Sequence, residues 1–334
     1  MNFIRIPVFL GLGMRKFTKG GYNRASRNFP SEHNETEPSK TTVMITGGNQ
    51  GIGFAAASAL AKKGCHVYIV CRNEARGVEA VDAIKNSSGN PNVHLLVGDV
   101  SSLGDIRRLA SQFRSTGKPL NVLINNAGVM VDPSLSKDGY ELNFATNTLG
   151  SYAMARAFEP ILKASAAAKV IFVASGGALT EPLEVNDLQG DHVKKNKSFG
   201  QTQYARDKRR QIAIVEHLSK EWSNIGVYSM HPGWVDTQGV QSSMPDFYST
   251  FHSSLRSLEE GADTIVWLAT RDKDRLEAGA FYLDREVQSK HLPLGGTGYT
   301  EAEVATLMQK LNVMIQPALL YLANDGVSTV RVAA

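Results

Sequence analysis

Short apolar runs alternate with longer amphipathic stretches along the chain from residue 42 onward. Six runs have the length of strands: TVMIT (42–46), HVYIVC (66–71), VHLLV (93–97), LNVLIN (120–125), KVIFVAS (169–175) and VYSMH (227–231). They carry little polar alternation, as do strands that are buried on both faces, and the stretches between them suit crossover helices. The pattern predicts a single doubly wound α/β fold, with a mostly parallel sheet of about seven strands and helices on both faces.

Charge and cysteine usage exclude several classes of function. The net charge is +4, and six basic residues precede the first acid, Glu32, so the rest of the chain is close to neutral. A nucleic-acid-binding protein carries a basic stripe on its folded body, and we therefore expect no nucleic-acid partner. Cys65 and Cys71 lie six residues apart in one strand, too far apart for a disulfide, and no His or Cys stands at ligand spacing, so no metal site is predicted.

The first strand runs directly into a glycine-rich turn, TGGNQGIG (46–53), which is followed by a helix. Glycines there let the backbone approach a pyrophosphate at the helix N-terminus, where free N–H groups and the helix dipole favour an anion. The position between the first strand and the first helix predicts a dinucleotide site. Its expected members are Gly47, Asn49, Gln50, Gly51, Ile52 and Gly53.

The second predicted strand ends in Cys71-Arg72-Asn73. Enzymes that prefer NAD commonly place an acid at this position, where it binds the ribose 2′-hydroxyl. Arg72 would instead attract a 2′-phosphate, so NADP(H) is the expected cofactor. The alternative is that Arg72 only covers the surface at the strand end.

Further motifs follow in a fixed order: NNAG (125–128), YARDK (204–208) and HPGWVDT (231–237). Together with the TGxxxGxG spacing of the glycine-rich turn, they resemble the short-chain dehydrogenase/reductase family of Rossmann-fold oxidoreductases. The resemblance implies that NADP(H) is also bound by residues at the ends of the third, fourth and sixth strands. These residues are Asp99, Val100, Asn126, Ala127, Gly128, Pro232, Gly233, Val235 and Thr237.

Tyr204 and Lys208 stand four residues apart on a predicted helix and therefore share one of its faces. A free tyrosine has a pKa near 10, and we expect the neighbouring ammonium group to lower it. By the family resemblance, Tyr204 exchanges a proton with the substrate oxygen and Lys208 also holds the nicotinamide ribose. The resemblance implies two further catalytic residues, Ser175 as a hydrogen-bond partner of the substrate oxygen and Asn147 in a proton relay through Lys208.

The long segment between Ser175 and Tyr204 resembles the insertion of retinol-dehydrogenase-like and WW-domain oxidoreductase-like members of the family. That resemblance implies an apolar alcohol or carbonyl compound as substrate. The expected function is an NADP(H)-dependent oxidoreductase in which Tyr204 is the general acid or base. The alternative from another class is a Rossmann-fold nucleotide sensor or scaffold with little catalysis.

The chain divides into a basic N-terminal extension (1–40), a short-chain dehydrogenase/reductase Rossmann domain (41–290) and a C-terminal extension (291–334). Residues 1–30 fit three interpretations: a segment lying on an anionic membrane, a mitochondrial-type presequence, or an arm packed on the body. Pro7, Gly11 and Gly13 disfavour a regular helix there.

The C-terminal extension contains AEVATLMQKLNVMI, which has the apolar spacing of a helix and fits a substrate lid, a dimer surface or core packing. An intracellular protein is expected, with a membrane-associated and a mitochondrial location both open. The oligomeric state is also open.

Overall fold

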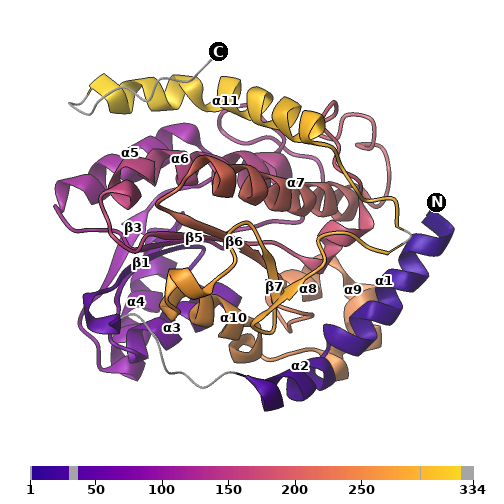
Figure 1. Ribbon diagram of the computed structural model, residues 1–334, viewed down its shortest axis with the longest axis horizontal. Helices are drawn as coiled ribbons and strands as arrows, with labels where there is room; N and C mark the ends of the chain where they lie inside the picture. Colours follow the sequence, from indigo (N-terminus) through magenta and orange to yellow (C-terminus); the bar gives the residue numbers. More distant parts are fainter. Residues whose placement is uncertain (1, 30–36, 294, 325–334) are drawn as a thin grey trace.

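Eight strands form one sheet in the computed structural model, which describes residues 2–29, 37–293 and 295–324 (Figure 1). The strands are β1 (Thr42–Thr46), β2 (His66–Cys71), β3 (Val93–Val97), β4 (Val122–Asn125), β5 (Lys169–Val173), β6 (Gly226–Met230), β7 (Phe281–Leu283) and β8 (Glu286–Gln288). Their order is β3-β2-β1-β4-β5-β6-β7-β8, and all neighbours are parallel except β7 and β8. The predicted doubly wound, mostly parallel sheet is confirmed, and its strand order reverses between β1 and β4, where such sheets bind ligands.

The six strands located from the sequence are all present. The two strands that sequence reasoning did not locate, β7 and β8, have three residues each and form the edge of the sheet beside β6. A three-residue strand is too short to show a period of two, and its place is set by pairing with β6 rather than by its own composition.

Helices cover both faces of the sheet (Figure 1). The helices are α1 (Asn2–Lys16), α2 (Lys19–Ala25), α3 (Gly51–Lys62), α4 (Glu74–Ser88), α5 (Leu103–Ser115), α6 (Ser151–Lys163), α7 (Phe199–Glu221), α8 (Gln238–Ser243), α9 (Pro245–Phe251), α10 (Leu258–Thr270) and α11 (Glu301–Asn324). On one face α3, α4 and α10 bury their apolar sides, and on the other face α5, α6 and α7 do so, with α11 packed outside them.

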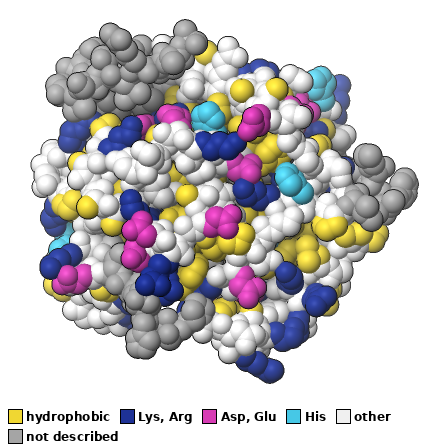
Figure 2. Space-filling model, viewed as in Figure 1, with side chains coloured by type: hydrophobic (Ala, Val, Ile, Leu, Met, Phe, Trp, Pro, Cys, Tyr) yellow, Lys and Arg dark blue, Asp and Glu magenta, His cyan; other side chains and the backbone are white. Residues whose placement is uncertain are grey.

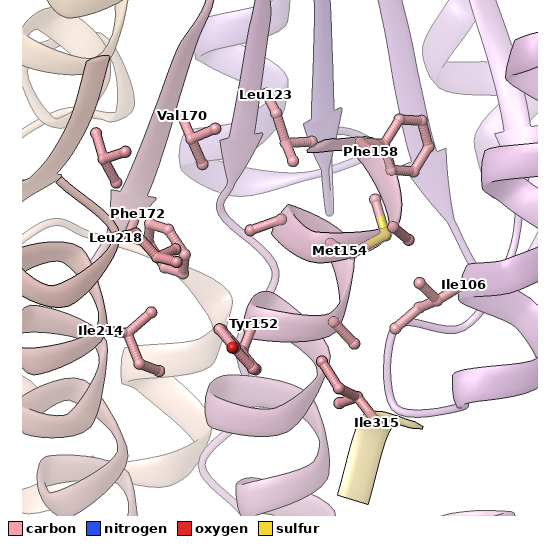
Figure 3. Close-up of a cluster of buried hydrophobic side chains, with 14 of the residues drawn as sticks. Ile106, Leu123, Tyr152, Met154, Phe158, Val170, Phe172, Ile214, Leu218 and Ile315 are labelled. Carbon is pink, nitrogen blue, oxygen red and sulfur yellow. The ribbon is translucent and has the colours of Figure 1, made fainter. Parts of the chain in front are cut away.

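The core beneath α5, α6 and α7 is continuous with the C-terminal helix (Figure 3). Side chains of β4 and β5 meet those of α6 and α7, and Ile315 of α11 lies in the same cluster. Leu307, Met308 and Leu311 of α11 are also buried there. Of the three interpretations of this helix, the structure shows core packing. Cys65 and Cys71 are buried and do not form a disulfide with each other, as their spacing predicts.

The N-terminal segment forms a continuous helix, α1, through Pro7, Gly11 and Gly13. The prediction that these residues disfavour a helix is wrong, and tertiary packing explains why. A Cβ on Gly13 would lie 2.2 Å from the Trp234 ring, so glycine is what allows the helix to approach the indole. Phe9 and Phe17 join Trp234 in a cluster of aromatic rings.

A buried arginine holds the end of α1 on the body. The Arg256 guanidinium donates to the main-chain oxygens of Lys16 (2.7 Å) and Phe17 (3.0 Å), and it pairs with Asp284. The amide of Trp234 donates to the same Phe17 oxygen at 2.7 Å. Of the three interpretations of this segment, the structure shows a packed arm. No helix in the described ranges is long and apolar enough to cross a bilayer.

The packing of α11 predicts a sharp contrast between two neighbouring positions. Leu311 is fully buried, whereas Val313 is 65% exposed on the same helix. We expect Leu311→Ala to lower the free energy of unfolding by about 2–5 kcal/mol, because it leaves a cavity in the core. The matched Val313→Ala variant should change it by no more than about 0.5 kcal/mol. Urea denaturation measures both, and equal small effects would show that α11 is not part of the cooperative unit.

Candidate active site

The glycine-rich turn between β1 and α3 adopts a backbone that requires glycine. Gly47 and Gly51 have φ angles of +67° and +56°, in the left-handed region that L side chains rarely adopt. A Cβ on Gly53 would lie 2.3 Å from the Gly47 oxygen, so this glycine permits close packing of the helix against the turn. Around Gly51, in contrast, a Cβ would meet open space. The turn is therefore tightly packed on its inner side and open on its outer side.

Asn126, at the end of β4, holds this turn in place. Its side-chain amide donates to the main-chain oxygens of Thr46 (2.9 Å) and Gly47 (3.3 Å). The main-chain amides of Asn126 and Ala127 both donate to the Thr46 hydroxyl at 3.0 Å. The NNAG segment thus ties the carboxyl ends of β1 and β4 together at the point where the strand order reverses.

A hollow of about 410 Å³ lies in front of the N-terminus of α3. It is lined by Asn49, Gln50, Arg76, Glu79, Ala80 and Gln238. Gln50 precedes the helix without capping it through its side chain, so the first amide groups of α3 have no side-chain cap. Unpaired helix amides beside a basic side chain suit a phosphate-bearing ligand, and a dinucleotide therefore fits the residues present.

One basic side chain, Arg76, lines this hollow, and a second, Arg72, lies four residues before it in the chain. Arg72 is exposed directly after β2, as expected from the sequence, and Arg76 lies one helical turn further along in α4. Sequence reasoning missed Arg76, although its spacing of four residues from Arg72 was visible. It also missed Gln238, which reaches the hollow only because the segment after β6 folds back towards α3.

Asp99 and Val100 follow β3 on the same edge of the sheet. The Asp99 carboxylate accepts hydrogen bonds from the amide (2.9 Å) and the hydroxyl (2.7 Å) of Ser101. Val100 is buried, and its main-chain oxygen lies where a Cβ on Gly150 would clash at 2.1 Å. Asp99 therefore shapes the turn with one of its oxygens.

Ser175 and Tyr204 meet at the carboxyl end of β5. Ser175 caps the short 3₁₀ helix η4 (Gly176–Thr180) by accepting from the Gly177 amide at 3.1 Å. Tyr204 lies in the second turn of α7, is partly exposed, and its phenol forms a hydrogen bond with Ser175. The two hydroxyl groups therefore form one pair, on residues that are both half-buried.

Lys208 lies one turn further along α7 and is buried. Its ammonium group donates to the main-chain oxygen of Val173 (2.7 Å) and to the side-chain oxygen of Gln211 (3.1 Å). It lies 5.4 Å from the centre of the Tyr204 ring. A Cβ on Gly128 would lie 3.5 Å from this ammonium group, which places the end of NNAG beside it.

Asn147 lies in a π-helical segment, η3 (Phe144–Gly150), that leads into α6. Its side chain exchanges two hydrogen bonds with the backbone of Val129, at 2.8 and 2.9 Å, and its main-chain oxygen accepts from Gln211 at 2.6 Å. Gln211 therefore bridges Lys208 and Asn147. Sequence reasoning missed both Gln211 and the π-helical segment, since a wider helical turn leaves no distinct hydrophobic pattern.

Burial sets the protonation states of Tyr204 and Lys208. Loss of solvent raises the pKa of Tyr204 to about 12, and the hydrogen bond from Ser175 only partly opposes the rise. Burial also lowers the pKa of Lys208 to about 8, against the charge of Asp207, which raises it. The expectation of a lowered tyrosine pKa is wrong for this arrangement. The reason is that the ammonium group uses its hydrogen bonds on Val173 and Gln211 and lies beside the ring rather than at the phenol oxygen.

The segment after β6 approaches the same end of the sheet. Gly233 has a φ angle of +84°, and a Cβ there would lie 2.2 Å from the Arg256 side chain. Pro232 accepts a hydrogen bond from Arg256, Val235 is buried, and Thr237 caps α8 by accepting from the Val240 amide. Arg256 therefore fixes the Pro232–Gly233 turn and the N-terminal arm together.

The structure thus brings Ser175, Tyr204, Lys208 and Asn147 together, in reach of Gly128. The residues expected at the phosphates and the adenine end lie on β1, β2 and β3, towards the other end of the carboxyl edge. Arg72 is three strands away from Ser175. An extended dinucleotide would span this distance along the crevice at the strand-order reversal.

The fold and this site define a short-chain dehydrogenase, and comparison with known proteins agrees. The family model for short chain dehydrogenase matches residues 41–186. The chain is 39% identical over 318 residues to dehydrogenase/reductase SDR family member 12 of Homo sapiens, covering 95% of this chain and 99% of that protein. The chain belongs to the short-chain dehydrogenase/reductase family of oxidoreductases.

Two other matches are more distant. Retinol dehydrogenase 12 of Mus musculus is 30% identical over 288 residues, covering 85% of this chain and 87% of that protein. A solved short chain dehydrogenase from Escherichia coli CFT073, in complex with NADPH, has a TM-score of 0.61 at 19% identity, covering 75% of this chain and 100% of that one. At this identity the structural match shows the fold alone.

His231, which is buried beside the Pro232–Gly233 turn, makes the stability of the protein depend on pH. Its ring packs edge-on against Phe17 at 4.4 Å, neither ring nitrogen has a hydrogen-bond partner, and burial followed by the charge of Arg256 lowers its pKa to about 3. The unfolded chain binds a proton at this residue near pH 6.5 and the folded protein does not. Stability is therefore fully present above that pH and is lost as the pH falls.

Between pH 7 and pH 5 this loss amounts to about 2 kcal/mol. We expect His231→Asn to remove this loss of stability, so that the free energy of unfolding depends less steeply on pH than in the unmodified protein. Urea titrations at several pH values measure the slopes. His252→Asn, at an exposed histidine, is the control and should keep the original slope. Parallel slopes for all three proteins would contradict the assignment.

Proposed function

We propose that this protein transfers a hydride between NADP(H) and a carbonyl or alcohol carbon of an apolar substrate, with Tyr204 as the general acid or base. The observation that supports this best is the hydrogen-bonded pair of Ser175 and Tyr204 beside the buried ammonium group of Lys208. A tyrosine that is hydrogen-bonded and still partly exposed can reach a ligand oxygen.

The reaction divides between the cofactor and the chain. The nicotinamide supplies or accepts the hydride when it is bound. Ser175 and Tyr204 hold the substrate oxygen, and Tyr204 gives it a proton during reduction or takes one during oxidation. Lys208 supplies positive charge next to the phenol and, with Asn147, lies beside Gly128 on the expected nicotinamide side. Gln211 keeps Lys208 and Asn147 in register.

The preference for NADP(H) rests on Arg72 and Arg76. Both are exposed at the adenine end of the crevice, and Arg76 lines the hollow at the N-terminus of α3. Two guanidinium groups favour a 2′-phosphate over a 2′-hydroxyl through charge-assisted hydrogen bonds. We propose that the remaining residues expected at the cofactor, from Gly47 to Thr237 in chain order, line the same crevice.

An apolar substrate is supported by the surroundings of the reactive pair and by the relatives. The loop after β4 carries Met130 and Val131, and a Cβ on Gly200, one turn before Tyr204 in α7, would lie 3.0 Å from the Val131 oxygen. One relative, retinol dehydrogenase 12, is named for a hydrophobic alcohol. A pure nucleotide sensor would have no need for the hydroxyl groups of Ser175 and Tyr204 beside the ammonium group of Lys208.

Removal of the phenol hydroxyl tests the chemistry. We expect Tyr204→Phe to lower NADPH-dependent carbonyl reduction by at least about a hundredfold, because the proton donor is lost, while NADPH affinity stays the same. The measurement is NADPH oxidation with retinaldehydes and medium-chain aldehydes, together with nucleotide binding followed by calorimetry. Tyr68→Phe, in the buried part of β2, is the control and should keep full activity. A Tyr204→Phe protein that turns over at the original rate would contradict the proposal.

Cofactor choice is tested by binding alone. We expect the unmodified protein to bind NADPH more tightly than NADH, and expect Arg72→Ser combined with Arg76→Ser to weaken NADPH at least about tenfold. NADH affinity should be nearly unchanged, which makes it the internal control for correct folding. Equal affinities for the two nucleotides in the unmodified protein would show that these arginines only cover the surface and do not bind the 2′-phosphate.

A further inference from the structure

The outer face of α1 is an apolar stripe that nothing in the described chain covers. Ile6 (47% exposed), Leu10 (37%) and Met14 (46%) stand four residues apart and therefore lie on one side of the helix. Pro7 and Gly11 are exposed among them, and a Cβ on Gly11 would meet open space. No charged or polar side chain interrupts the stripe, which we call the α1 stripe.

Basic side chains border the α1 stripe at its C-terminal end and along α2. They are exposed, and they are Arg15, Lys16, Lys19, Arg24 and Arg27. The sequence contains no acid before Glu32, so nothing neutralises these charges within the segment. Figure 2 shows hydrophobic side chains towards the right-hand edge and several Lys and Arg side chains below them, in the part of the view where Figure 1 places α1 and α2.

The α1 stripe cannot turn inward, because the opposite side of the helix is fixed. Gly13 lies against the Trp234 ring, and the buried Arg5 donates to the main-chain oxygens of Thr180 and Gly295, each at 2.8 Å. The end of the helix is held by Arg256. The exposed apolar side chains are therefore a fixed feature of the folded protein.

We propose that the α1 stripe and its basic border bind the surface of an anionic lipid membrane. An amphipathic helix of this kind lies in the membrane plane, with its apolar side chains at the acyl boundary and its Lys and Arg side chains at the headgroups. A second copy of the same face is a poorer occupant, since the segment before Glu32 contains no acid and would offer the basic border no partner of opposite charge. The proposal does not depend on the oxidoreductase function.

The position of the α1 stripe gives membrane binding a consequence for the site. The inner side of α1 packs on Trp234, in the segment that follows Pro232–Gly233, and Trp234 in turn contacts Phe247 and Phe251 of α9. A bilayer that holds α1 would therefore lie on the side of the molecule where Phe17 approaches Gly176, the residue after Ser175.

Flotation of the full chain with lipid vesicles tests this inference. We expect binding to vesicles of phosphatidylcholine that contain about 30% phosphatidylserine, and only weak binding to phosphatidylcholine alone. Binding should be lost as the salt concentration is raised, because salt screens the attraction between the basic side chains and the anionic headgroups. Ile6→Glu combined with Leu10→Glu should weaken partition at least about tenfold. Lys19→Glu combined with Arg27→Glu should make the protein bind equally weakly to the two vesicle types.

The control places the same glutamate at another exposed apolar residue, Val313 on α11, and should leave flotation unchanged. Reduction of a water-soluble aldehyde without vesicles should be the same in all variants, which separates this proposal from the one on catalysis. Failure of the unmodified protein to float with either vesicle type would overturn the membrane proposal. A change from dimer to monomer in the Ile6, Leu10 variant, seen by light scattering without any effect on flotation, would assign the stripe to a second copy and overturn it as well.

Discussion

The arrangement of the site depends on three consecutive cations of α7 that the fold buries. Lys208, Arg209 and Arg210 are all shielded from solvent, and burial of a charge is unfavourable unless polar partners surround it. Main-chain oxygens supply most of them. Lys208 binds the last residue of β5, Arg209 binds Glu181 and Lys290, and Arg210 binds Glu184, Asp187 and Leu188 in addition to Asp207. The helix that carries Tyr204 is thereby joined at once to the sheet, to the long insertion and to the segment before α11.

Another buried cation, Arg256, joins separate segments on the other side of the crevice. Arg256 connects the end of α1, the Pro232–Gly233 turn and Asp284 of the β7–β8 connection. In both places guanidinium groups donate hydrogen bonds to main-chain oxygens of segments that are far apart in the sequence, as the five N–H donors of an arginine allow. The N-terminal arm is for this reason part of the folded body, and its outer face has a fixed orientation towards whatever the protein meets.

The sequence predicted the parts of this structure that local patterns encode. The central strands and the glycine-rich turn follow from apolar runs and from a motif at a strand end. The expectation that Ser175, Tyr204, Lys208 and Asn147 belong to one site came from the family resemblance, and their role in catalysis is a proposal. The helical arm was not predicted, because the packing of Gly13 on Trp234 decides it, and these two residues are far apart in the sequence. Gln211 and Arg76 were missed for a related reason. Their importance comes from neighbours in space, and a glutamine or an arginine on a helix usually means only a solvated surface.

The charged run after Tyr204 shows how a correct motif can still mislead about its surroundings. A run of charges on a helix normally marks its exposed face, yet here four of these charged side chains are buried: Asp207, Lys208, Arg209 and Arg210. Burial acts on Tyr204 and Lys208 in the direction of neutrality, since it raises the pKa of the phenol to about 12 and lowers that of the ammonium group to about 8. At neutral pH the phenol therefore keeps its proton while the lysine is still mostly charged. In the proposed reaction this protonation state is the one that carbonyl reduction requires, whereas alcohol oxidation requires a phenolate that the same burial makes unfavourable.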